Sequence, residues 1–305
     1  MNYALYITRR FVLDLKNNNY QHNKIVAAIH DLSGIGRCSL SVIMPILSAM
    51  GIQVCAVPTA ILSSHTGGLG DNVTVDLNDY VKNALSHYKT LGIEFNAIYS
   101  GYLNSHTQAD NCIAYMQNYP NALKVVDPVM GDHGKLYKAC TADLCREMKE
   151  LAAQSDVITP NLTEAVLLLD EDYSNLPLTV SFVKSMLVRL SQKGPRVVCI
   201  TKIQFADGSF NNVGYDRERD AFWRVELENL PVNYPGTGDM FAAIIVGALL
   251  HSDSLPIALE RATRFLEIAI KTTYGYGTDP RYGVLFEQNL GWLSSSHSFG
   301  QYKKM

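Results

Sequence analysis

The sequence lacks the features that identify several large classes of protein. No run of Lys or Arg exceeds two residues and the formal net charge is -3, so nothing indicates a nucleic-acid or anionic-membrane surface. The longest strongly apolar run spans residues 240–250, which is too short to cross a bilayer. The six cysteines are scattered and form no C-x-x-C pair, which indicates reduced thiols in a cytoplasmic protein and no zinc site.

The first 23 residues also lack the pattern of a signal peptide. They carry Arg9, Arg10 and Lys16, but no compact apolar stretch before a small-residue cleavage site. Hydrophobic residues make up 47% of the chain and charged residues 18%, as in folded globular proteins. We therefore expect an N-terminal extension at 1–23, a single domain at 24–292 and a C-terminal tail at 293–305.

Short apolar segments alternate with helical segments along most of the chain. The apolar segments are rich in β-branched residues and are followed by turns, which is typical of buried strands. We expect strands at 24–30, 52–57, 96–100, 123–126, 156–159 and 196–201, a hairpin at 211–227, and helices at 38–50, 76–91, 105–119, 141–153, 179–193, 238–251 and 255–273. This order predicts an α/β fold with a mostly parallel sheet covered on both faces, whose ligands bind where the strands end.

The segment Pro235-Gly236-Thr237-Gly238-Asp239 directly precedes an apolar helix. Its two glycines allow the backbone to approach a ligand closely, and the amides of Gly236, Thr237 and Gly238 would lie at a helix N-terminus, which favours anions. Asp239 would repel a phosphate, but it suits this place if it takes a proton from an attacking hydroxyl. The alternative is a glycine-rich turn with Asp239 as a helix cap.

Two further segments carry oxygen ligands after predicted strands. In Asp127-Pro128-Val129-Met130-Gly131-Asp132, two carboxylates on a strand-exit loop can hold a cation or serve metal-bound phosphate, unless they are solvated acids of a turn. In the segment Thr159-Pro160-Asn161-Leu162-Thr163-Glu164, Thr159 or Asn161 could cap the next helix and Glu164 could complete a capping arrangement. The same Asn161 and Glu164 could also hold Mg²⁺.

These three segments together resemble the signatures of the ribokinase-like (PfkB-type) kinases. Gly236 to Asp239 is similar to their phosphate-binding motif, T-P-N-x-x-E to their magnesium motif, and D-P-V-M-G-D to the pyridoxal kinase and hydroxymethylpyrimidine kinase branch. The resemblance covers residues 24–273 and implies a three-layer fold with a small β lid or hairpin. It implies that Asp239 is the catalytic base, that the preceding amides form an anion hole, and that Asp127, Asp132, Asn161 and Glu164 serve the metal.

The resemblance also assigns the two substrate ends. Ser64-His65-Thr66-Gly67 looks like the pyridoxal kinase loop, so Thr66 would contact the pyridine ring and His65 would line the pocket. Tyr102 would pack beside the substrate, although ordinary half-buried packing would explain it as well. Asp31 stands where many pyridoxal kinases have serine, and it could pair with the ring nitrogen, the 3-hydroxyl or an amine. Thr201, Lys202 and Tyr234 would lie near the nucleotide; Lys202 departs from the usual serine and would contact phosphate or point to solvent.

The implied activity is ATP-dependent phosphorylation of the 5′-hydroxyl of pyridoxal, pyridoxine or pyridoxamine. It implies ATP and Mg²⁺, K⁺ as an activator, and a homodimer. Alternatives are a hydroxymethylpyrimidine kinase, a more distant sugar kinase and a vitamer-binding protein without activity. A dinucleotide-binding oxidoreductase is disfavoured because Ser39 stands where the third glycine of G-x-G-x-x-G is needed, and no Walker motif occurs.

Overall fold

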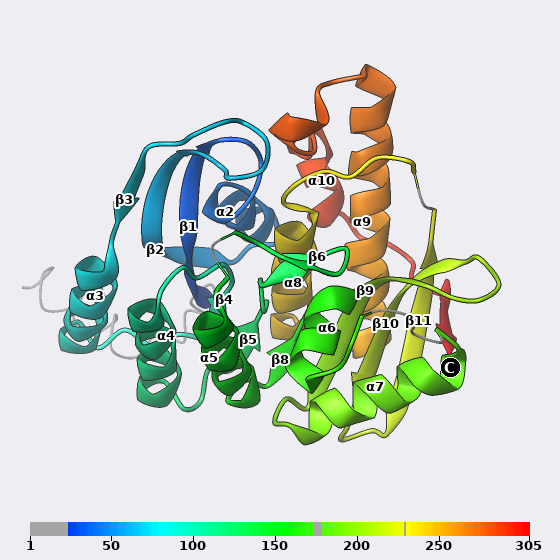
Figure 1. The fold of residues 1–305 in the computed structure, drawn as a ribbon, viewed down its shortest axis with the longest axis horizontal. Coiled ribbons are helices and arrows are strands. Elements are labelled where there is room, and N and C mark those ends of the chain that lie inside the picture. The colour runs from blue at the N-terminus through cyan, green and yellow to red at the C-terminus, as the bar shows by residue number, and fades with distance from the viewer. Residues whose placement is uncertain (1–23, 139, 174–177, 229) are drawn as a thin grey trace, which may run out of the picture.

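A computed structural model describes residues 24–305 apart from 139, 174–177 and 229, so the expected N-terminal extension lies outside the described residues. Ten strands form one sheet in the order β12-β11-β10-β9-β8-β5-β4-β1-β2-β3 (Figure 1). Their bounds are β1 Ile25–Ile35, β2 Gln53–Ser64, β3 Thr74–Asp76, β4 Ala97–Ser100, β5 Leu123–Val126, β8 Val157–Ile158, β9 Val197–Gln204, β10 Phe210–Asp216, β11 Ala221–Leu227 and β12 Tyr302–Lys304. A small separate hairpin consists of β6 Gly131–Asp132 and β7 Lys135–Leu136.

The central strands from β2 through β1, β4, β5 and β8 to β9 are all parallel, as the alternating pattern predicts. The strands at the two edges are antiparallel. The hairpin that the sequence predicted at 211–227 is β10 and β11, which extend the main sheet. The segment that we set apart as a C-terminal tail contributes β12, which pairs with β11.

Helices cover both faces of the sheet and complete three layers, which confirms the predicted fold class. One face carries α2 Leu40–Ala49, α8 Thr237–Leu250, α9 Leu255–Tyr276 and α10 Leu290–Leu293. The other carries α3 Asn78–Thr90, α4 His106–Asn118, α5 Ala142–Ala153, α6 Leu162–Leu169 and α7 Val180–Gln192. Alternate residues of β1 feed the two cores: Val26 and Ala28 enter one, Ala27 and Ile29 the other.

Two strands run further than their apolar segments predict. β1 continues past His30 to Ile35 and β2 past Val57 to Ser64, where β3 joins β2. The pairing of β1 with β2 shifts by one residue between His30 and Leu32. Such a bulge re-aims side chains, and it lies beside the polar residues that follow the apolar part of β1.

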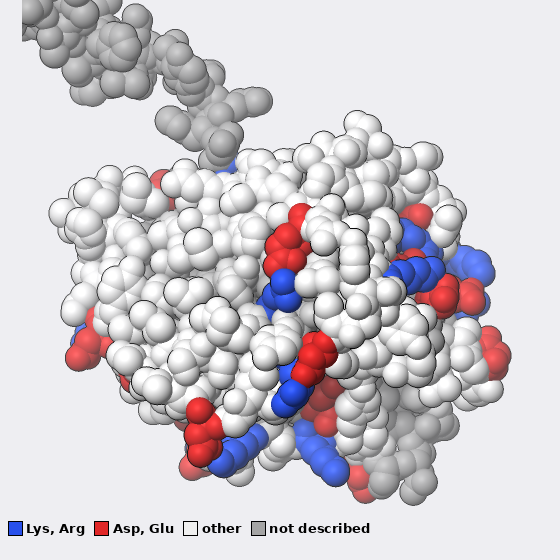
Figure 2. All heavy atoms as spheres, turned by 90° about the horizontal axis from the view of Figure 1, so that it is seen from above, with Lys and Arg blue, Asp and Glu red and all other residues white. Residues whose placement is uncertain are grey.

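Acidic and basic side chains are interspersed over the face of the molecule shown in Figure 2. Ion pairs among the described residues include those of Arg281 with Asp279 and of Arg37 with Glu287. No helix within the described ranges has the length and apolar character that a membrane span requires.

Candidate active site

A cavity of about 1010 Å³ opens where the parallel strands end, at the edge that such sheets use for ligands. All fifteen residues that the sequence nominated line it, although they come from segments far apart in the chain. The cavity walls contain Asp31, His65, Thr66, Tyr102, Asp127, Asp132, Asn161, Glu164, Thr201, Lys202, Tyr234, Gly236, Thr237, Gly238 and Asp239. The structure therefore brings the predicted residues together, and their individual roles stay predictions.

The turn before α8 has the conformation that its glycines suggest. Gly236 has a φ of 77°, and a Cβ atom there would lie 2.0 Å from the carbonyl oxygen of Arg37, so only glycine fits. Gly236 is the N-cap of α8 and no side chain caps this end of the helix. The first amides of an α-helix have no partner within it, so the start of α8 presents N–H groups and partial positive charge at the cavity.

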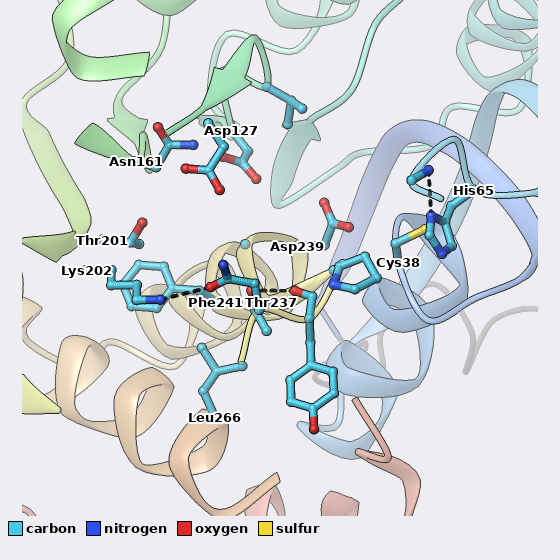
Figure 3. A pocket seen from close by; sticks show the side chains of 18 of the residues that line it. Cys38, His65, Asp127, Asn161, Thr201, Lys202, Thr237, Asp239, Phe241 and Leu266 are labelled. Carbon is cyan, nitrogen blue, oxygen red and sulfur yellow. Dashed lines mark hydrogen bonds between the residues drawn. The ribbon is translucent and has the colours of Figure 1, made fainter. Parts of the chain in front are cut away.

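Asp239 lies in the first turn of α8 and does not cap it, which rules out the alternative left open by the sequence. Its carboxylate accepts the amide N–H of Ser39 at Oδ2 (2.6 Å) and lies 3.2 Å from Nε2 of His30 at Oδ1. Only 9% of the residue is exposed, and the side chain points into the cavity near Asp127 (Figure 3). This carboxylate can therefore meet a ligand while it remains held by the protein.

Asp127 and Glu164 form a pair of buried acids beside Asp239. Burial and the charge of Asp239 raise the pKa of Asp127 to about 7, although Thr159 donates a hydrogen bond to it at 3.2 Å. Burial and the charge of Asp127 raise the pKa of Glu164 well above its usual range. A cation would relieve the repulsion between these oxygens, so the donor set fits Mg²⁺ that also keeps water and phosphate ligands.

The oxygens of Glu164 also hold the backbone. They accept the amides of Asn161 (2.8 Å) and Met130 (3.2 Å), and Asn161 accepts the amide of Glu164 at 3.0 Å. The capping box that the sequence left open is thus present. Asp132 is half-exposed and accepts the amide of His133, so it lies at the rim of the acid pair. Among the described residues no three His, Cys, Asp or Glu side chains gather as a metal site, so few protein ligands are available.

Asp127 gives a prediction that links stability to pH. Its pKa is about 7 in the folded protein and about 4 in an unfolded chain. The folded state therefore binds more protons between these values, and the free energy of unfolding falls as the pH rises through this window. Asp127→Asn removes this loss of unfolding free energy, because its side chain does not ionise, and it keeps an acceptor for Thr159. Without Mg²⁺ the variant should therefore unfold at a higher temperature than wild type at about pH 8. Each kcal/mol gained would raise the midpoint by about 2–4 °C.

The control for this variant is to compare its unfolding midpoint with that of wild type at low pH. At about pH 4 both proteins carry a nearly neutral group at position 127, so their unfolding midpoints should converge. A variant that unfolds at or below the wild-type temperature at both pH values would show that the buried charge of Asp127 is not a source of instability.

At the end of the cavity where the sequence predicts the acceptor, the protein already orients the polar side chains. The Gly67 amide donates to Nδ1 of His65 (2.9 Å), which assigns the proton to Nε2, and Nε2 donates to the carbonyl oxygen of Arg281 (2.6 Å). The oxygens of Asp31 have protein partners in His30 (2.8 Å) and Ser33 (3.0 Å). Burial would raise the pKa of Asp31, but the bond from His30 holds it below its usual range.

At the opposite end, the predicted nucleotide end, Thr201 forms a bridge with Asn161, and the Thr201 amide donates to the carbonyl oxygen of Pro160 at 3.1 Å. Lys202 is an exposed residue of the cavity lining with a φ of 54°, and its Nζ donates to Asn233 Oδ1 at 3.1 Å (Figure 3). The side chain of Tyr234 is buried, and its carbonyl oxygen accepts the hydroxyl of Thr237.

Several cavity residues were not predicted. An apolar shelf at the nucleotide end is formed by Leu227, Leu230, Val232, Phe241, Leu266 and Ile270. Leu266 and Ile270 lie one turn apart on α9, a spacing that also describes core residues, so the sequence could not distinguish the two. Pro280 and Arg281 close the acceptor end from the segment after α9, and His30 and Ser39 reach Asp239 from the first strand and the turn after it.

The chain is similar in sequence to known proteins. The sequence model of the phosphomethylpyrimidine kinase family matches residues 45–282. The pyridoxal kinase PdxY of Deinococcus radiodurans is 27% identical over 244 residues, which cover 76% of this chain and 81% of that protein.

Solved structures extend the likeness. A Bacteroides thetaiotaomicron protein provisionally assigned to the phosphomethylpyrimidine kinases is 42% identical, with a TM-score of 0.90 over 94% of this chain and 100% of that one. A second crystal form of it, with pyridoxal, has a TM-score of 0.88 over 93% of this chain and 100% of that one. The pyridoxal kinase of Lactobacillus plantarum is 34% identical, with a TM-score of 0.81 over 89% of this chain and 96% of that one.

Proposed function

The chain belongs to the phosphomethylpyrimidine kinase family, and on this basis we propose that it transfers the γ-phosphoryl group of ATP to the 5′-hydroxyl of a B6 vitamer: pyridoxal, pyridoxine or pyridoxamine. One observation carries the proposal: a buried aspartate and the free N-terminus of an apolar helix face the same cavity. The vitamer as acceptor is supported by the 42% identical Bacteroides protein, whose second crystal form contains pyridoxal.

In the proposed reaction the 5′-hydroxyl oxygen forms a bond to the γ-phosphorus, and the bond from this phosphorus to the β–γ bridging oxygen breaks, so that ADP leaves. Asp239 accepts the hydroxyl proton. The amides of Gly236, Thr237 and Gly238 stabilise negative charge on the transferring group. His30 and the amide of Ser39 hold the two oxygens of Asp239, and the close approach of Gly236 to the Arg37 carbonyl fixes the turn before α8. Positioning therefore contributes much of the rate.

When bound, Mg²⁺ neutralises charge on the nucleotide phosphates. Asp127, Asn161 and Glu164 would hold it, and Asp132 would add a carboxylate at the rim. In the protein alone Glu164 and Asn161 also fix the start of α6, so the residues that would serve the metal are held rigidly before it binds.

The two ends of the cavity would take the two substrates. Asp31, His65, Thr66 and Tyr102 would surround the vitamer ring. At the other end Thr201 and Lys202 would face the phosphates, and Tyr234 would lie with the apolar shelf near the adenine. The family resemblance further supports a monovalent activator such as K⁺ and a homodimer. Together with the scattered unpaired cysteines it also supports a cytoplasmic location.

A panel of acceptors tests the proposal. ATP and Mg²⁺ are supplied with pyridoxal, pyridoxine, pyridoxamine, hydroxymethylpyrimidine or ribose, and ADP release and product mass are measured. We expect stoichiometric ADP and a 5′-phosphate with one or more of the vitamers, and none with ribose. Phosphorylation of hydroxymethylpyrimidine alone would show that the acceptor is the pyrimidine. Binding of vitamers without ADP release would show that the protein is not catalytic.

A further inference from the structure

The contact between His30 and Asp239 is one of the two that hold the proposed base, and no sequence pattern indicated it. His30 lies in β1 and Asp239 in α8, 209 residues apart in the sequence. The imidazole is 2% exposed and lies between two carboxylates: Nε2 is 3.2 Å from Asp239 Oδ1 and Nδ1 is 2.8 Å from Asp31 Oδ1. A buried histidine between two acids, one of them facing a cavity, requires a physical reason.

The surrounding backbone is shaped to hold this ring. A Cβ atom on Gly101 would lie 2.1 Å from Cδ2 of His30, so glycine leaves the space that the imidazole occupies. The amides of Asp31 and Tyr102 lie 3.0 and 3.1 Å from Nδ1 and Nε2, respectively. The bulge between β1 and β2 begins at the same residue. The ring is therefore fixed from β1 and from the exit of β4.

The second oxygen of Asp239 is held by a strained backbone. Ser39, which donates its amide to Oδ2, has a φ of 57°, a conformation that costs energy for a residue with a side chain. His30 and Ser39 thus fix one oxygen each, and both come from the β1–α2 segment. Each carboxylate oxygen retains a second lone pair, so Asp239 can still accept a proton from a ligand in the cavity.

The charges around His30 also favour its contact with Asp239. Burial opposes a charge on His30, but Asp239 and Asp31 raise the pKa of its imidazole to about 10, which favours the protonated ring. The carboxylates that face it are Asp239 and Asp31, and Asp127 is a further buried acid near Asp239. The imidazolium offsets part of this negative charge.

We propose that His30 is a positioning residue for Asp239: it holds Oδ1 and keeps the carboxylate directed at the acceptor hydroxyl. This inference rests on the proposed function, because it gives meaning to the pair only if Asp239 is the base. His30 itself touches no substrate in this scheme. Its loss should therefore lower kcat and leave the KM for ATP and for the vitamer nearly unchanged.

A double-mutant cycle separates this role from a merely structural one. His30→Gln, Asp239→Asn and the double variant are compared with wild type, using single-turnover kinetics with ATP, Mg²⁺ and the accepted vitamer. We expect His30→Gln alone to lower kcat by about 10-fold or more, with both KM values within about 3-fold. In the Asp239→Asn background the same change should alter kcat by less than about 2-fold, because the group that His30 positions is already gone.

Equal losses in the two backgrounds, an unchanged kcat, or a raised vitamer KM with kcat retained would each overturn the inference. Asp239→Asn with wild-type kcat would instead remove the proposed base, so the two failures are distinguishable. If His30→Gln does not fold, His30→Asn replaces it in the cycle, since Asp239 and Asp31 then keep their own side chains. His251→Gln is the matched control: that ring donates to Met50 O (2.7 Å) away from the cavity, and kcat should not change.

Discussion

Replacing Asp239 with alanine is expected to lower kcat by about 100-fold or more and to leave ATP binding nearly intact, because the hydroxyl loses the group that accepts its proton. Asp239 suits this test because its helix does not depend on it: Gly236 is the N-cap, and the Asp239 side chain makes no cap bond. Its partners are His30 and the Ser39 amide, so the fold around the nucleotide end should persist.

The measurement pairs steady-state kinetics with calorimetry of ATP binding and a thermal unfolding curve. Asp253→Ala is the control, since Asp253 lies outside the cavity and pairs with Arg261 (3.0 Å). Asp253→Ala should keep kcat while it removes one ion pair. Near-normal turnover in Asp239→Ala would remove Asp239 as the base, and lost ATP affinity would assign it to nucleotide binding.

Replacing each of two glycines of the same turn with alanine should lower activity, but only one of the two replacements should lower stability strongly. At Gly236 the added Cβ would lie 2.0 Å from a backbone oxygen and the φ is 77°, so nothing can move cheaply. Gly236→Ala should lower the free energy of unfolding by about 2–4 kcal/mol and abolish most activity, because the turn and the start of α8 must shift.

At Gly238 the added Cβ would meet only Oδ2 of Asp127, at 3.9 Å, so the folded protein has room for it. Gly238→Ala should unfold within about 1 kcal/mol of wild type, because alanine is no worse than glycine in a helix. It should nevertheless lower kcat by about 10-fold or more, since the methyl group occupies space beside the amides that face the phosphoryl group.

Gly275→Ala provides the matched control for both variants, because no atom lies within 4 Å of a Cβ there and the residue lies in α9 outside the cavity. Chemical denaturation and kcat are measured for all three variants. Equal stability losses at positions 236 and 238 would show that the turn is rigid throughout, and an active Gly238→Ala would place the phosphoryl group elsewhere.

The sequence predicted that polar residues at the ends of strands would meet in one cavity. Asp127 follows β5, Asn161 lies just beyond β8 and Thr201 lies in β9, and they meet because these parallel strands point to one edge of the sheet. Periodicity and turn residues are local signals, and for these residues local signals were sufficient.

Contacts set by the packing of distant segments could not be predicted. No local pattern joins His30 to Asp239, and the positive φ of Ser39 arises where the β1–α2 turn meets the start of α8. The continuation of β1 to Ile35 depends on pairing with β2, which an apolar segment ending at His30 does not reveal. For Glu164 the pattern served two purposes at once, because the oxygens of a capping box are also suitable for a cation.

Different parts of the chain line the two ends of the cavity. Residues 30–102 and 280–281 line the proposed acceptor end, residues 201–234 and 263–271 line the proposed nucleotide end, and residues 127–164 and the start of α8 also contribute to the lining. Under the proposed function, substitutions in residues 30–102 and 280–281 would change which alcohol is accepted and leave nucleotide binding intact. Such a division allows related enzymes to diverge in acceptor while they inherit the same phosphate chemistry, and it makes these residues the place to begin any re-engineering of selectivity.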